Sequence, residues 1–275
     1  MVFKVKKIIV LLIIFFMLIV YLFLFGKLFP FSPFTIGFEK HELNNITIYL
    51  ENGSAFNDFD EIDTFTKDVE TFHRLKFRDK PEIYVFSDKN SYYKKTITKA
   101  RFIAYPNGTV MISPWAIDEA RQGTISLEIY LKHELSHIIL FQNMGLIASY
   151  KYPQWLLEGI AVYSTNQMGT SCYPDKSMTY KILQKGNYFP PNYFKTAKED
   201  DIILNIENPI AFKYSEFACI VDYLITTYGE EKFYQYMFGL FKNYNHNEVF
   251  KNIYKIEFQD FLIKFVDETK TRIKS

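Results

Sequence analysis

The chain has 275 residues, of which 48% are hydrophobic and 19% aromatic, and its formal net charge is +1. This composition excludes an intrinsically disordered chain, and the length suffices for one large domain or two small ones. The near-neutral charge, without a long basic block, excludes nucleic acid as an expected partner.

The N-terminus combines a short basic segment with a long apolar run. Residues 1–7 include three lysines, and residues 8–25 contain neither a charged residue nor a proline. As a helix, this run would be about 27 Å long, close to the thickness of a hydrocarbon core. Neither a small-residue cleavage site nor a lipid-accepting cysteine follows it. We therefore expect an uncleaved signal anchor over residues 8–26 rather than a removed signal peptide.

The distribution of lysines predicts the orientation of this anchor. Three lysines precede the apolar run, and only Lys27 follows it directly. Positively charged residues next to a span stay preferentially in the cytoplasm. Residues 1–7 are therefore expected in the cytoplasm, with a single pass through the lipid bilayer of the cell membrane and the rest of the chain outside.

The segment after the anchor reads as a linker. Residues 27–42 contain Pro30 and Pro33 and show no convincing hydrophobic periodicity. Prolines without periodicity are typical of irregular chain. This pattern predicts a juxtamembrane linker, with the globular domain spanning residues 43–272.

The first half of this domain carries the strand signals. Residues 46–50 and 82–86 read as strands, and residues 59–75 place their apolar side chains on one helical face. A short polar stretch, expected to be helical, follows the second strand. The apolar runs of residues 101–114 flank Pro106-Asn107-Gly108, which predicts a β-hairpin.

The second half of the domain reads as helical. From Thr124 onward the pattern is mostly helical, with breaks near Gly145, Pro153, residues 169–174 and residues 190–191. The expected fold class is therefore α+β, with a small N-terminal β-sheet half and a helical C-terminal half, preceded by one transmembrane helix.

The cysteines and three of the histidines carry no metal-binding pattern. Cys172 and Cys219 lack the spacing of a zinc knuckle, and a disulfide between them and two free thiols both remain open. His41 and His73 occur in ordinary contexts and read as structural or surface residues. His246 precedes a predicted helix and reads as a loop residue.

The segment "LKHELSHIIL" holds the strongest signal in the chain. His133 and His137 are four positions apart, within an apolar helix expected over residues 125–142. They would lie one turn apart on one face, where two imidazoles can share a metal ion. Glu134 would point about 100° away, beside the ion, where a base for a metal-bound water must stand. The alternative is a core helix with two buried histidines, which is costly unless those groups find partners.

A third ligand is expected on the next helix. The metzincin pattern is excluded because Leu140 and Asn143 stand where it requires glycine and histidine. Glu158 is the only acidic residue between Ile138 and Asp175, and it lies in an apolar helical segment beginning near Pro153. A lone carboxylate in such surroundings needs a cation. The small side chains of Gly159 and its neighbours would let two helices approach closely.

The pairing of "HELSHIIL" with "PQWLLEGIAVY" resembles the gluzincin zinc metallopeptidases, and most closely the peptidase MA-like family. Further segments are similar to an edge strand above the cleft, to a downstream tyrosine-containing helix and to the C-terminal helices of that family: "GTVMISP", "YSEFACIVDYLITTYGEEKF" and "NEVFKNIYKIEFQDFLIKF". The resemblance covers about residues 100–270 and implies a zincin-like (thermolysin-like) fold.

The same resemblance implies a site and an activity. His133, His137 and Glu158 would hold one Zn²⁺ per chain, and Glu134 would be the general base and proton shuttle. Tyr214 corresponds to the downstream tyrosine of the family. Val162 replaces an aspartate of the thermolysin type, so the partner that orients a ligand imidazole cannot be assigned.

The expected function is that of a membrane-anchored zinc-dependent peptidase acting on a peptide or protein substrate. An extended substrate is expected to pair with the strand at residues 109–113. Two alternatives remain open. One is a catalytically silent, peptidase-like extracytoplasmic sensor or binding domain, and the other is a zinc hydrolase acting on non-peptide amides.

Overall fold

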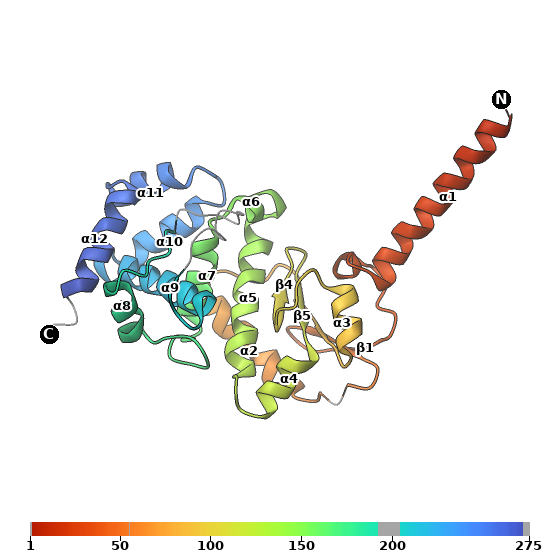
Figure 1. Ribbon diagram of the computed structural model, residues 1–275, viewed down its shortest axis with the longest axis horizontal. Helices are drawn as coiled ribbons and strands as arrows, with labels where there is room; N and C mark the ends of the chain where they lie inside the picture. The colour runs from red at the N-terminus through yellow and green to blue at the C-terminus, as the bar shows by residue number, and fades with distance from the viewer. Residues whose placement is uncertain (1, 55, 192–203, 272–275) are drawn as a thin grey trace.

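The computed structural model describes residues 2–54, 56–191 and 204–271, which form a mixed α+β structure (Figure 1). The described part contains a sheet with the strand order β1-β2-β3-β5-β4. Pairing is parallel between β2 and β3 and between β3 and β5, and antiparallel at both ends of the sheet. The strands are β1 (Phe38–Glu42), β2 (Thr47–Glu51), β3 (Glu82–Val85), β4 (Phe102–Ala104) and β5 (Thr109–Ile112).

The described helices are α1 (Val2–Phe25), α2 (Phe59–His73), α3 (Lys89–Lys95), α4 (Pro114–Arg121), α5 (Leu127–Met144), α6 (Leu146–Lys151), α7 (Gln154–Ser164), α8 (Lys176–Gln184), α9 (Pro209–Tyr228), α10 (Glu230–Gly239), α11 (His246–Tyr254) and α12 (Phe258–Thr271). Helix α1 precedes the strands, α2 and α3 lie between strands in the chain, and the other described helices follow β5 (Figure 1). The helices α2, α3 and α5 fall where the sequence pattern predicts them, and the predicted breaks near Gly145, Pro153 and residues 169–174 separate α5, α6, α7 and α8. Helix α4 and the breaks after α9, α10 and α11 were not predicted.

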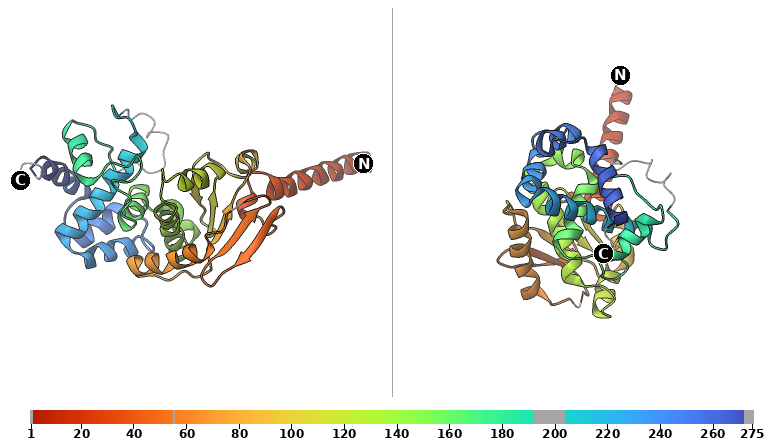
Figure 2. Two further views of the ribbon diagram at one scale, coloured as in Figure 1. Left: turned by 90° about the horizontal axis from the view of Figure 1, so that it is seen from below. Right: turned by 90° about the vertical axis from the view of Figure 1, so that its left-hand side faces the viewer.

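Most of helix α1 projects away from the rest of the chain (Figure 1; Figure 2, left). Within it, residues 7–25 are long and apolar enough to cross a membrane, with a mean hydropathy of 3.4. None of that segment is buried against the protein. By its length and composition, this helix is a candidate for crossing a membrane.

Both faces of the sheet are buried, as expected for a sheet with parallel strands at its centre. Along β3, Ile83 and Val85 point to the face covered by α2 and α5. Tyr84 and Phe86 point to the opposite face and join an aromatic cluster that includes Phe29. The central core therefore lies between the sheet and α5, the helix that carries the His-Glu-x-x-His motif.

The helical half packs most closely between α7 and α9. Gly159 of α7 lies against the main chain of α9, and a Cβ there would come within 2.7 Å of the Phe217 carbonyl oxygen. Its small size is thus needed for the contact with α9. A side chain on Gly159 would push α7, and the glutamate that it carries, away from its place.

Three expectations about the elements are wrong. The predicted linker contains β1, which pairs with β2, and the 3₁₀ turn at residues 29–31, whose Phe29 is buried. The expected edge strand, residues 109–113, corresponds to β5, which lies between β3 and β4, so β4 is the edge. His246 is a buried residue at the first position of α11, among aromatic rings, and not a loop residue.

Two further expectations concern the hairpin and the cysteines. The predicted hairpin is confirmed by the antiparallel pairing of β4 with β5. Cys172 is exposed and Cys219 is buried, and both are free thiols. Of the two alternatives that the sequence left open, the structure has the free thiols.

Candidate metal centre

Helix α5 presents the two histidines of the motif one turn apart. Ser126 caps its start by accepting a hydrogen bond from the amide of Ile129. Gly145 ends it with a φ of 80°, a conformation that suits glycine. Both ends are thus fixed by local sequence, and the buried apolar face of the helix, which includes Leu131, Leu135 and Ile138, sets its rotation. His133 and His137 are buried on the face toward α7.

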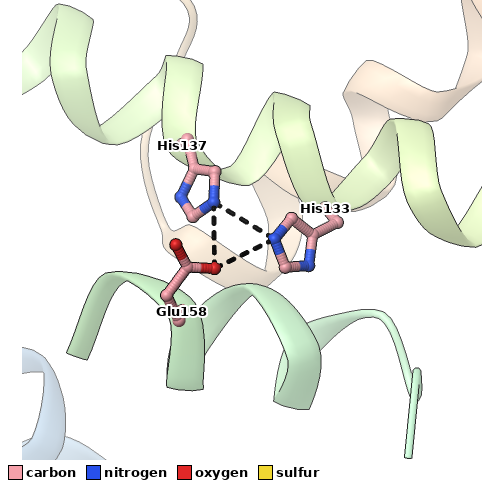
Figure 3. Close-up of side chains that lie close together, drawn as sticks. All are labelled: His133, His137 and Glu158. Carbon is pink, nitrogen blue, oxygen red and sulfur yellow. Dashed lines mark hydrogen bonds and ion pairs between the residues drawn. The ribbon is translucent and has the colours of Figure 1, made fainter. Parts of the chain in front are cut away.

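Helix α7 brings Glu158 to the same point, and three donor atoms converge (Figure 3). The Nε2 atoms of His133 and His137 are 3.2 Å apart. The Glu158 Oε2 atom lies 3.3 Å from the His133 Nε2 atom and 3.6 Å from the His137 Nε2 atom. Ligands placed tetrahedrally around one zinc ion at about 2.0–2.2 Å would be about 3.3–3.6 Å apart. The three residues could therefore hold one metal ion.

The two imidazoles favour the ionised form of the Glu158 carboxylate. Burial of the Glu158 carboxylate would raise its pKa, but the neighbouring imidazoles outweigh burial and hold that pKa well below its ordinary value. Burial lowers the pKa of His133, yet its hydrogen bond to Glu158 and the charge of Glu134 leave the pKa raised overall. A buried carboxylate that stays ionised is a suitable ligand for a cation.

Gln167 orients one of the imidazoles, a role that no sequence pattern indicates. The His133 Nδ1 atom lies 2.8 Å from the Gln167 Oε1 atom. An amide oxygen can only accept, so Nδ1 carries the proton and the Nε2 lone pair is left free for a metal ion. The Gln167 side chain is buried, and the loop after α7 positions it through a hydrogen bond from its main-chain amide to the Val162 oxygen. Gln167 is thus the partner that the sequence could not assign.

Glu134 lies outside the cluster of donor atoms but faces the same cavity. The cavity measures about 610 Å³, and its described lining includes all three clustered residues and Glu134. Burial raises the pKa of the Glu134 carboxyl, while the imidazoles of His133 and His137 oppose that rise. A carboxylate whose pKa is moved toward neutrality can both take and return a proton near pH 7.

Two phenols line this cavity as well. Tyr214, singled out from the sequence, comes from α9, and Tyr173 comes from the loop before α8. Burial and then the charge of Glu158 raise the pKa of Tyr214 well above its ordinary value. Tyr173 was not expected there, and burial raises its pKa too. Both remain protonated at neutral pH and can donate a hydrogen bond.

The strand beside the cavity, β4, turns some of its main-chain groups away from β5, and among them the Ala104 amide binds the Glu134 carboxylate. The Arg101 oxygen accepts a hydrogen bond from the amide of Ser113, just after β5, and the Tyr105 amide donates to the oxygen of Thr109 in β5. Main-chain groups alternate along a strand, so those of Phe102 and Ala104 face away from β5. Residues 100–104 line the cavity. The edge next to the clustered residues is therefore β4, not the strand expected from the sequence.

The remaining histidines lie outside this site. His73 is buried where α2 meets α5, with its Nδ1 atom 2.8 Å from the Val69 oxygen and its Nε2 atom 2.8 Å from the Ser136 Oγ atom. His41 stacks on Phe59. The structural reading of His73 is confirmed, since both of its nitrogens have protein partners.

Comparison with family models finds no match, and comparison with curated proteins finds none. The interpretation of this centre therefore depends on its own geometry. Within the described residues, His133, His137 and Glu158 are the group whose donor atoms lie close enough to share an ion.

Proposed function

We propose that this chain is a membrane-anchored zinc-dependent peptidase of the gluzincin type, with the zincin-like fold of the peptidase MA-like family. The observation that carries the proposal is the convergence of two imidazole nitrogens and one carboxylate oxygen from α5 and α7, at 3.2 to 3.6 Å from one another. A second carboxylate, Glu134, faces the same cavity without belonging to the cluster. Three protein ligands with an adjacent base are typical of hydrolytic zinc sites.

The donor set favours zinc over other common ions. Two imidazoles and one carboxylate suit Zn²⁺, whereas Mg²⁺ and Ca²⁺ prefer oxygen ligands alone. His133, His137 and Glu158 would hold the ion, and Gln167 would keep His133 in the right tautomer. When bound, Zn²⁺ would polarise a peptide carbonyl and lower the pKa of a water molecule.

The other residues of the cavity would act on the substrate. Glu134 takes a proton from the attacking water and delivers it to the leaving amine, a role consistent with its raised pKa. Tyr214 donates a hydrogen bond to the oxyanion as charge develops on the substrate oxygen. The main-chain groups of Phe102 and the oxygen of Ala104, on the side of β4 away from β5, pair with an extended peptide, which holds it beside Glu134.

The test uses the full chain in lipid nanodiscs. Metal content after dialysis against limiting Zn²⁺ should be about one ion per chain, and a mixed peptide library should be cleaved. Glu134→Gln should keep the metal and lose about 100-fold or more in kcat. Glu128→Gln is the matched control, because Glu128 lies on the same helix but pairs with Lys132 at its outer surface.

The outcomes separate the alternatives. Zinc binding without cleavage by the wild-type chain would support a silent sensor or binding domain. Cleavage of non-peptide amides, with no cleavage of peptides, would support the zinc hydrolase that acts on non-peptide amides. A folded chain that binds no zinc would contradict the proposal.

A further inference from the structure

The chain that leaves α1 is built into the domain. Phe29 is 2% exposed and its ring packs against Phe38 and Tyr84. The Pro30 oxygen accepts a hydrogen bond from the Asn107 side chain at 2.6 Å. Lys27 donates to main-chain oxygens at the end of α3. The domain is therefore attached directly to the end of α1, which limits the faces that it can turn toward a membrane.

One of those faces carries exposed apolar side chains. Phe31, Phe34, Ile36 and Ile97 are all exposed, and we call them the juxtamembrane patch. The Phe31 ring contacts the Tyr105 ring, and the Ile97 amide donates to the Tyr105 hydroxyl. The two segments are thus neighbours around one residue. Two exposed lysines close to Ile97 in the chain, Lys94 and Lys99, add positive charge to this region.

A second apolar patch lies farther along the same side. Leu146 and Ile147 of α6 are 61% and 67% exposed, and we call them the α6 patch. In Figure 1, α6 caps the upper end of α5, on the side of the domain toward which α1 rises. Lys151, also exposed, ends this helix. Two separate apolar patches, each with lysines nearby, therefore face the direction in which the anchor leaves.

We propose that the domain lies on the surface of the membrane that α1 spans, with both patches in contact with anionic phospholipid. Three features favour a bilayer over another protein. The juxtamembrane patch begins only six positions after the last residue of α1. Its aromatic and aliphatic side chains with flanking lysines have the composition that settles at a bilayer interface. The lysines attract anionic head groups.

This placement would set the substrate class of the cavity, a consequence that depends on the proposed peptidase function. The described lining begins at Thr98, next to Ile97, and includes Phe141 and Gln154, which lie on either side of α6 in the chain. The cavity lining therefore includes close chain neighbours of both patches. An extended peptide paired with β4 would run close to the lipid surface, so the substrates would be membrane-proximal segments of anchored proteins or lipid-attached peptides.

The docking is tested on the full chain in nanodiscs that contain phosphatidylglycerol. Single nitroxide labels are placed at residues 34, 97 and 147 in a Cys172→Ser background, since Cys219 is buried. Residues 178 and 263 are the matched controls. Met178 and Ile263 are 49% and 53% exposed on α8 and α12, at the end of the domain far from α1 (Figure 1).

Collision with oxygen and with a water-soluble nickel complex reports the surroundings of each label. Lipid contact predicts oxygen-dominated relaxation at 34, 97 and 147, and nickel-dominated relaxation at 178 and 263. Nickel-dominated relaxation at either patch would overturn the proposal. Protection from both reagents would also overturn it, because it would indicate that protein, such as a second copy of the chain, covers the patch.

The substrate consequence has its own test. One peptide is offered either free in solution or attached to a lipid in the same nanodisc, and Ile97→Asp with Ile147→Asp removes both contacts. The lipid-attached peptide should be cleaved about tenfold less well by the double variant, with cleavage of the free peptide unchanged. An equal loss for both peptides would contradict the consequence. Cleavage of neither by the wild-type chain would count against the peptidase function while leaving the label data to decide the docking.

Discussion

Gln167 links the loop after α7 to the imidazole of His133. The hydrogen bond between the Gln167 Oε1 atom and the His133 Nδ1 atom is buried, and its two residues are 34 positions apart in the chain. Because the amide oxygen only accepts, the bond selects one tautomer of the imidazole. That tautomer leaves the Nε2 lone pair free to bind a cation shared with Glu158, so Gln167 prepares the centre for a cation.

Replacing Gln167 by leucine should therefore weaken metal binding. We expect the Kd for Zn²⁺ to rise about 10- to 100-fold, because the imidazole loses its fixed tautomer and orientation. Gln167→Glu should restore most of the affinity, since a carboxylate also accepts from Nδ1. Competition with a chromophoric chelator measures the Kd. The exposed Gln235→Leu on α10 is the control, and an unchanged Kd in a folded Gln167→Leu chain would show that this bond does not matter.

The residues of the centre differ in how far the sequence could predict them. His133 and His137 follow from helical spacing, which is a local property. Glu158 follows from its isolation among apolar residues. Gln167 carries no such signal, because its role arises only when the loop after α7 folds back onto α5. The proximity of Tyr173 to Tyr214 is hidden for the same reason, since two distant segments meet in space.

At the scale of elements, Gly159 sets the distance between α7 and α9. The sequence predicted that this glycine permits two helices to approach, and the structure shows that the second helix is α9 rather than α5. A methyl group at Gly159 would overlap the main chain at Phe217, which cannot rotate away as a side chain could. The helix gains about 1 kcal/mol in propensity from alanine, and overpacking costs about 1–3 kcal/mol.

We expect Gly159→Ala to be destabilising overall, by about 1–2 kcal/mol, because the overlap is with main chain. Thermal unfolding of the detergent-solubilised chain should show a lower Tm by several degrees. Ser164→Ala on the same helix is the control, since the Ser164 hydroxyl only bonds to a main-chain oxygen one turn earlier. A Tm equal to or above that of the wild type would show that α7 and α9 can separate at little cost.

The sheet shows which element properties are local. The hairpin was predictable because a strong turn signal separates two apolar runs. The order of strands was not, because β5 acquires its second neighbour from β3, far earlier in the chain. β1 escaped notice because its sequence, Phe-Glu-Lys-His-Glu, lacks an apolar alternation and only its pairing with β2 makes it a strand.

At the scale of the whole molecule, buried histidines couple stability to pH. Burial lowers the pKa of His73, where α2 meets α5, to about 4 from an ordinary value of 6.5. His246, within the aromatic cluster of the helical half, has its pKa lowered to about 4 for the same reason. Both are neutral in the folded chain and protonated more readily in the unfolded chain. Their contribution to the free energy of unfolding is therefore fully present above pH 6.5 and is lost as the pH drops toward 4.

Each histidine should contribute up to about 3 kcal/mol to this loss. We expect the Tm of the metal-free chain to fall steadily between pH 6.5 and 4.5. His73→Gln should lower the Tm at pH 7, because a buried imidazole and its two hydrogen bonds are lost, but should remove about half of the dependence on pH. His41→Gln, at a partly exposed position, should leave the slope unchanged. A slope that is unaffected by His73→Gln would assign the acid sensitivity to other groups.

The two thiols offer a test of how the molecule sits in the membrane. Cys172 is exposed and Cys219 is buried in the core, so only Cys172 should react in the folded chain. Lysines before the apolar run predict that residues 1–7 stay in the cytoplasm, and a retained α1 keeps the domain on the outer surface. The burial of Phe29 in the domain supports retention, because the end of α1 continues directly into folded structure.

A membrane-impermeant maleimide applied to intact cells should therefore label the wild-type chain at Cys172. The labelled chain should stay with the membranes after an alkaline carbonate wash, since a spanning helix is not removed by such a wash. Cys172→Ser should abolish labelling of intact cells, and adding Val2→Cys to it should restore labelling only after the cells are permeabilised. Labelling of residue 2 on intact cells, with protection of Cys172, would reverse the orientation. Release of labelled chain into the medium would show that α1 is cleaved, and the domain would then depend on its two apolar patches alone to remain at the lipid surface.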